Sequence, residues 1–106
     1  MFKDVFETVW DAAKAGNVER LKQLISNGDD HKPFNVGEQT PWLGNTPLHI
    51  AVKNKQLKAI KVLIWELKAD NKLENYSKMN SIDYCKKFIK EEATKATAMG
   101  LLTKMH

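Results

Sequence analysis

The sequence has few of the residues that build cross-links or metal sites. Cys85 is the only cysteine among 106 residues, which excludes an intramolecular disulfide and a zinc site built from several cysteines. The three histidines, His31, His49 and His106, are far apart, and the five glycines stand singly rather than in a phosphate-binding loop. We therefore expect a protein that is not an enzyme, with no metal and no cofactor, in which Cys85 fills a small core position.

Arginine and long apolar runs are also scarce. Only one of the 17 basic residues is an arginine, and 13 acidic residues are interspersed among them to leave a net charge of +4. This mild, mixed charge argues against a nucleic-acid partner. No stretch approaches the roughly 20 apolar residues of a membrane span, and the acidic N-terminal segment does not resemble a targeting peptide. We expect an intracellular protein, in the cytoplasm, with an organelle or the nucleus as alternatives.

Short apolar stripes with helical spacing run through the chain in pairs. The first pair covers residues 6–13 and 18–25, and the second covers residues 48–52 and 57–67. Polar stretches rich in Gly, Pro, Asn and Asp follow each pair and predict extended loops or hairpins. A third pair is expected at residues 81–88 and 89–105, with Ala93, Ala96 and Leu102 facing the core. The pattern predicts an all-α fold.

These helix pairs recur at a regular interval. Val9, Leu48 and Ile82 are each expected to be the first core residue of a short helix, with separations of 39 and 34 residues. A small residue, alanine or cysteine, follows each of them three positions later. Small residues at a fixed place allow neighbouring helices to pack closely, so the sequence predicts a stack of similar units.

At this point the sequence resembles the ankyrin repeat, whose unit of about 33 residues carries a Thr-Pro-Leu-His-x-Ala signature. "TPLHIA" at 46–51 matches it residue for residue. The first unit lacks Thr-Pro and has Trp10 in the position of the histidine, and the third unit has Asp83 there. The resemblance covers about residues 5–90, strongly in the middle and weakly at the end. Two departures are a longer first interval and one extra residue in "LIWELKAD".

The resemblance implies an ankyrin-repeat solenoid of helix-turn-helix units joined by β-turn or hairpin loops. We expect a single domain over residues 1–106, with units at about 5–30, 42–72 and 76–104 and a long loop at 29–45. Thr46 is well placed to cap a helix, and Pro47 suits its first turn. By the same resemblance, the Thr46 hydroxyl and the His49 ring join a hydrogen-bond network that ties the turn to the helix, so His49 is structural.

The resemblance also implies a partner-binding surface made of hairpin tips and the exposed positions of the first helix in each unit. We expect the tip residues to be Trp42, Leu43, Asn45, Tyr76 and Met79. The helix face is expected to carry a lysine column of Lys14, Lys53 and Lys87 and, beside it, Asn54 and Phe88. The aromatic tip residues are candidate binding hot spots. For Trp42 an alternative is that it folds back over Phe34 and Val36 of its own loop.

The sequence thus predicts a non-catalytic protein–protein interaction module. The expected partner is another protein, and the lysine column is compatible with an acidic patch on it. No small-molecule substrate is expected. The alternative is a small structural subunit built permanently into a large multiprotein assembly. An isolated adaptor should melt cooperatively, whereas an obligate subunit should be unstable without its neighbours.

Overall fold

The computed structural model describes residues 7–26 and 33–104, which form helices and loops and contain no β-strand. The helices are α1 (Val9–Ala15), α2 (Val18–Ser26), α3 (Pro47–Lys53), α4 (Leu57–Lys61), η1 (Val62–Glu66), α5 (Ser81–Phe88) and α6 (Glu92–Thr103). The all-α prediction is confirmed. Residues 29–32 of the expected long loop lie outside the described residues. None of the described helices is long and apolar enough to cross a membrane.

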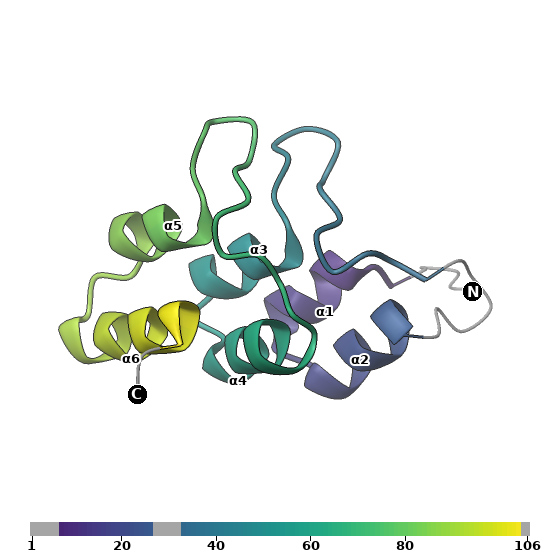
Figure 1. Cartoon of the computed structure of the whole chain (residues 1–106), viewed down its shortest axis with the longest axis horizontal. Coiled ribbons are helices and arrows are strands. Elements are labelled where there is room, and N and C mark those ends of the chain that lie inside the picture. The colour runs from purple at the N-terminus through teal and green to yellow at the C-terminus, as the bar shows by residue number, and fades with distance from the viewer. Residues whose placement is uncertain (1–6, 27–32, 105–106) are drawn as a thin grey trace, which may run out of the picture.

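The helices stack in two layers, and the two loops before α3 and α5 project from the same side (Figure 1). Helices α1, α3 and α5 form one layer, in which neighbours pack against each other, and each packs against its own second helix in the other layer. The core lies between the layers. Both layers contribute large buried side chains, such as Leu48 of α3 and Leu63 of η1, and the first helices add small buried residues such as Ala12 and Ala51. These alanines allow the close approach that the sequence predicted.

The first helix of every unit begins with the same hydrogen-bonded cap. In each capping box the N-cap side chain accepts the N–H of the residue three positions on, whose side chain in turn accepts the N-cap N–H. The pairs are Thr8 with Asp11, Thr46 with His49, and Asn80 with Asp83. A carboxylate accepts this bond as a histidine nitrogen does, which explains why the units can differ at this position.

The first unit corrects one feature of the sequence alignment. In the first unit Asp11, not Trp10, accepts the N-cap N–H, as His49 does in the second unit. The alignment on Val9 missed this because α1 begins one residue later than that alignment implied. Trp10 instead contacts the long loop. Its ring lies edge-on to Phe34 at 5.9 Å, and its Nε1 donates to the backbone oxygen of Glu38 at 2.9 Å. This contact attaches the long loop to α1.

The extra residue expected in "LIWELKAD" is accommodated inside the helix. Helix η1 is a π-helical turn, closed by the bond from the Leu67 N–H to the Val62 oxygen at 2.9 Å. One inserted residue in an α-helix produces such a turn. Trp65 lies on it, half-buried and packed against the core.

The third helix pair forms as predicted, with a different core face. Ala98 and Leu102 of α6 are fully buried, whereas Ala93 and Ala96 are exposed. The prediction that Ala93 and Ala96 face the core is therefore wrong, because α6 begins at Glu92 and turns these positions outward. Cys85 fills a small core position, as expected. Its thiol lies 3.8 Å from the Lys95 oxygen, and burial raises its pKa.

Among the described residues, every non-glycine residue with a positive φ is a lysine: Lys55, Lys68, Lys78 and Lys104, with φ between 56° and 66°. An L-residue in this conformation is destabilised relative to glycine. Lys55, Lys68 and Lys104 follow the C-terminal ends of helices, where a positive charge is favourable. The Lys68 Nζ also donates to the Trp65 oxygen at 3.3 Å. Helix-end electrostatics thus offsets backbone strain at these positions.

Candidate functional site

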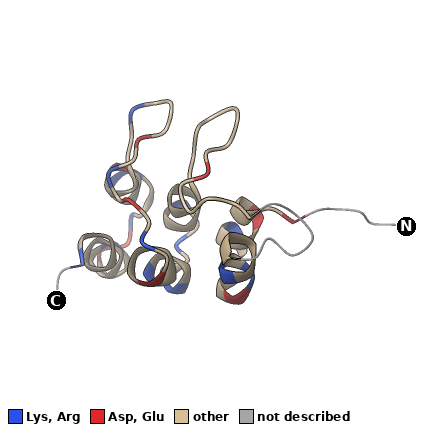
Figure 2. Cartoon of the chain, turned by 45° about the vertical axis from the view of Figure 1, so that its right-hand side comes forward, with Lys and Arg blue, Asp and Glu red and all other residues tan. Residues whose placement is uncertain are grey.

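Two hairpin loops form the edge of the molecule farthest from the second-helix layer (Figure 1). The first is closed by the Thr40 N–H donating to the Asn45 oxygen at 3.0 Å. The second is closed by the Asn75 N–H donating to the Met79 oxygen at 2.9 Å. Figure 2 shows that most charged residues lie on the helices rather than on these loops. The loops therefore present mainly uncharged surface.

The two hairpin tips are joined to each other. The Tyr76 N–H donates to the Leu43 oxygen at 3.0 Å, across the gap between the loops. Below this bond, the Gln39 Nε2 donates both to the Gly44 oxygen at 2.8 Å and to the Glu74 oxygen at 3.0 Å. Because the bonds to Leu43 and Glu74 cross from one loop to the other, the tips are held as one surface rather than as two independent loops.

Three large apolar side chains stand exposed on these joined tips. Trp42 is 88% exposed, Leu43 57% and Tyr76 60%. The alternative in which Trp42 folds back over its own loop is wrong, since Phe34 packs on Trp10 instead. We call Trp42, Leu43 and Tyr76 the tip patch.

Asn45 does not belong to this exposed surface, which corrects the sequence prediction. It is 3% exposed, and its Oδ1 accepts bonds from the Asn75 Nδ2 at 2.9 Å and from the Tyr84 hydroxyl at 3.0 Å. Its position immediately before the Thr46 cap turns the side chain inward, under the second hairpin. Asn45 therefore supports the tips from below and is out of reach of a partner.

Asn75 also shapes the second hairpin, and the sequence prediction did not include it. Its Oδ1 accepts the N–H groups of Ser77 at 2.9 Å and Met79 at 3.0 Å. An asparagine that bonds the backbone two residues on is a known turn former, so Asn75 in "ENYSKMN" carried the signal. Met79, a predicted tip residue, is half-buried and packs against the core.

His49 is the structural clamp that the sequence predicted. Its Nδ1 accepts the Thr46 N–H at 3.1 Å and lies 2.8 Å from the Thr46 hydroxyl. Nδ1 is thus an acceptor, so the ring proton resides on Nε2, which donates to the Met79 oxygen at 2.8 Å. Burial lowers the pKa of His49, against smaller raising effects from the Met79 bond and from Asp83. The neutral ring ties α3 to the second hairpin.

The predicted lysines Lys14, Lys53 and Lys87 are all exposed, one from each helix pair. Counted from the N-caps Thr46 and Asn80, Lys53 and Lys87 occupy the same position of their helices, seven residues on, whereas Lys14 lies six residues after Thr8. The predicted lysine column is therefore reduced to Lys53 and Lys87, because the first unit is shifted by one residue.

Asn54, beside Lys53, is half-buried, and its Nδ2 donates to the Ile50 oxygen at 2.8 Å at the end of α3. Phe88 is half-buried. Asn54 therefore has a structural bond in addition to its partial exposure.

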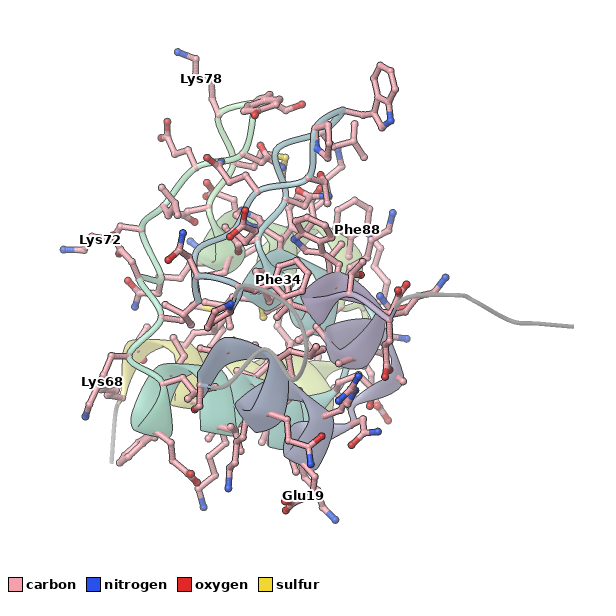
Figure 3. All side chains as sticks on the ribbon, turned by 90° about the vertical axis from the view of Figure 1, so that its right-hand side faces the viewer. Glu19, Phe34, Lys68, Lys72, Lys78 and Phe88 are labelled. Carbon is pink, nitrogen blue, oxygen red and sulfur yellow. The ribbon has the colours of Figure 1, made fainter. Side chains whose placement is uncertain are left out.

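Phe88 is the outer member of an aromatic stack that leads from the core to this face. The His49 and Tyr84 rings meet edge-on at 5.0 Å, and the Tyr84 and Phe88 rings at 4.8 Å. The Lys53 and Lys87 Nζ atoms lie 5.0 and 5.4 Å from the Phe88 ring centroid. The sequence prediction placed Phe88 beside the lysines but did not include Tyr84. The only sequence feature that indicates a contact between Tyr84 and Phe88 is their spacing of four residues, which places them side by side on a helix. In Figure 3, Phe88 lies on the opposite side from Lys68 and Lys72.

The described residues hold no arrangement of three or more His, Cys, Asp or Glu side chains that fits a metal ion. The comparisons with known proteins fit this architecture. A family model described as ankyrin repeats, in three copies, matches residues 8–75. Neither the curated proteins nor the solved structures gave a match. Ankyrin repeats are generally protein–protein interaction modules. Because the match spans more than half of the sequence, the chain belongs to the ankyrin repeat family.

Proposed function

We propose that the chain is a non-catalytic recognition module that binds a partner protein through the tip patch and the adjoining first-helix face. The observation that carries this proposal is the exposure of Trp42, at 88%, beside Leu43 and Tyr76. Large exposed apolar side chains cost solubility unless a partner covers them. Tryptophan and tyrosine are also the residues that most often dominate binding energy at interfaces.

The joined hairpins favour this role because they hold the patch in one arrangement. The Tyr76–Leu43 backbone bond and the Gln39–Glu74 bond connect the loops before any partner arrives. A surface that is ordered in advance loses less conformational entropy on binding. The patch therefore suits an apolar anchor point on the partner.

The lysine column suits a partner with an acidic patch. Its members Lys53 and Lys87 stand at the same position of α3 and α5, and Lys14 adds an exposed positive charge on α1. Such rim charges accelerate association and select among partners more than they add affinity. In this proposal the tips supply affinity and the column supplies orientation.

Affinity capture with the whole chain tests the proposal. Proteins retained by the wild type should be lost with a Trp42→Ala/Tyr76→Ala double variant that still melts cooperatively. Glu19→Ala serves as the control, because Glu19 lies at the far end of the molecule from the hairpin residue Lys78 (Figure 3). Unchanged capture by a folded double variant would remove the tip patch as the anchor.

The exposed patch also favours a second candidate, a subunit whose tips are permanently covered inside a large assembly. The two candidates differ in the behaviour of the isolated chain. A free adaptor melts cooperatively as a monomer, whereas a fixed subunit aggregates or melts low until its neighbours are added. Sedimentation and thermal melting of the purified chain, with and without captured proteins, separate them.

A further inference from the structure

We propose that the helix face recognises an acidic side chain of the partner, whose carboxylate is bound between the ammonium groups of Lys53 and Lys87 while an adjacent apolar group contacts Phe88. This inference rests on the proposed protein-recognition function and specifies the chemistry of one part of its surface. It concerns the carboxylate of an aspartate or glutamate, held at a position set by the aromatic stack.

The first argument is the gathering of two like charges on one ring. Lys53 comes from α3 and Lys87 from α5, yet their Nζ atoms lie 5.0 and 5.4 Å from the same Phe88 centroid. Attraction to the ring face holds each cation, but the two cations repel each other. In the described part of the chain, no carboxylate forms an ion pair with either of them. An external anion would relieve this repulsion.

The second argument is that the ring carrying the lysines is fixed from behind. Phe88 packs edge-on against Tyr84 at 4.8 Å. Tyr84 is in turn held by the His49 ring and by the bond from its hydroxyl to Asn45. Phe88 therefore has little freedom to move when a ligand arrives. Its half-exposed ring offers an apolar surface beside the two cations.

The third argument is the size of the charge cluster. Lys14 lies one position out of register with Lys53 and Lys87 and has no aromatic contact among the described residues. Its backbone oxygen accepts a bond from the Gln56 Nε2 at 2.8 Å. The cluster over Phe88 thus consists of two ammonium groups, with the Asp83 carboxylate on the same helix committed to the α5 cap. Two cations match the two oxygens of one carboxylate, whereas a nucleic acid requires a longer basic track.

Selection of peptides tests the proposal while the partner is still unidentified. A library of random 12-residue peptides, displayed on phage, is selected on the full-length chain, and enriched peptides are synthesised. We expect an aspartate or glutamate next to an apolar residue in these peptides. A Lys53→Gln/Lys87→Gln variant should bind them about tenfold more weakly, and Phe88→Leu should also weaken binding. Lys72→Gln, the control, should stay within about twofold of the wild type, because Lys72 lies on the opposite side of the molecule from Phe88 (Figure 3).

The decisive measurement combines a substitution in the peptide with the substitutions of Lys53 and Lys87. Replacing the peptide's glutamate by glutamine should weaken binding to the wild type but leave binding to the double lysine variant unchanged. Enriched peptides without acidic residues, or equal affinities for the wild type and the double variant, would overturn the carboxylate inference. If binding still depended on Trp42 and Tyr76, protein recognition would survive that result. A library that gives no binder, or peptides insensitive to both surfaces, would count against the proposed function and this inference together.

Discussion

The ring of Tyr76 lies directly against the backbone of Gly44, so close that a Cβ on Gly44 would stand 2.4 Å from a ring carbon. Gly44 also has a φ of +71°, which other residues adopt only with strain. The two hairpins therefore meet at a position where both the backbone angle and the available space require glycine. This relationship sets the position of Tyr76, and with it the form of the tip patch.

Substituting Gly44 by alanine should therefore be costly. We expect Gly44→Ala to lower the free energy of unfolding by about 1–3 kcal/mol, from the positive φ and the displaced Tyr76 ring. Gly100→Ala is the matched control. A Cβ at Gly100 in α6 meets nothing within 4 Å, so alanine should stabilise the helix by roughly 0.5–1 kcal/mol. Urea unfolding of both variants measures these opposite effects, and a neutral Gly44→Ala would show that the loops separate easily.

The sequence predicted the fold well because its strongest signals are local. The "TPLHIA" motif, the small residues at fixed places and the helical stripes each act within a few residues of the chain. The exact start of α1 was missed because Thr8 offers a cap that the alignment on Val9 did not consider. The outward position of Ala93 and Ala96 depends on how α6 docks against α5, which no short-range pattern in this segment specifies.

Acid should destabilise the protein through His49. Burial lowers the folded-state pKa below the ordinary value of 6.5, so below that pH the unfolded chain binds a proton more readily than the folded one. The free energy of unfolding should therefore fall as the pH drops through about 6.5 and toward the folded-state pKa. Protonation of Nδ1 also removes the acceptor of the Thr46 N–H. Melting temperatures measured between pH 7.5 and pH 5 check this direction.

A His49→Gln variant identifies the group responsible. It should be less stable at neutral pH by about 1–3 kcal/mol, because buried bonds to Thr46 and Met79 are lost or weakened. Its stability should also depend less on pH between 7.5 and 5 than that of the wild type. Asn54→Ala, which removes no titratable group, is the control and should keep the wild-type pH dependence. An identical pH profile for the wild type and His49→Gln would contradict the assignment.

The buried bonds of Asn45 predict a stability effect rather than a binding effect. Asn45→Ala leaves the Tyr84 hydroxyl and the Asn75 amide without their shared acceptor, which should cost about 2–3 kcal/mol. Asn54→Ala is the comparison, because water can replace its half-exposed bond to Ile50, and it should cost about 1 kcal/mol or less. Denaturant unfolding of both variants tests this difference. If Asn45→Ala weakened partner binding while leaving stability unchanged, the interior role would be wrong.

The site was harder to predict from sequence than the fold, for a physical reason. Trp42, Leu43 and Tyr76 could be placed at tips because loop residues between recognisable helices are easily counted. Whether a tip side chain points to water or to the interior depends on contacts with the other loop, as Asn45 shows. The gathering of Lys53 and Lys87 on Phe88 likewise joins two units and follows from their docking.

The lysines with positive φ give the last prediction. Lys78 lies on a hairpin with φ of 66° and, unlike the other three lysines, does not follow the C-terminal end of a helix. Lys78→Gly should therefore relieve backbone strain and raise the free energy of unfolding by about 0.5–1 kcal/mol. Lys68→Gly should gain less, because it also removes a favourable charge at the end of η1, worth about 0.3–1 kcal/mol, and the bond to the Trp65 oxygen. Parallel urea titrations measure both changes. Equal gains at the two sites would mean that the helix-end charge of Lys68 contributes nothing to stability.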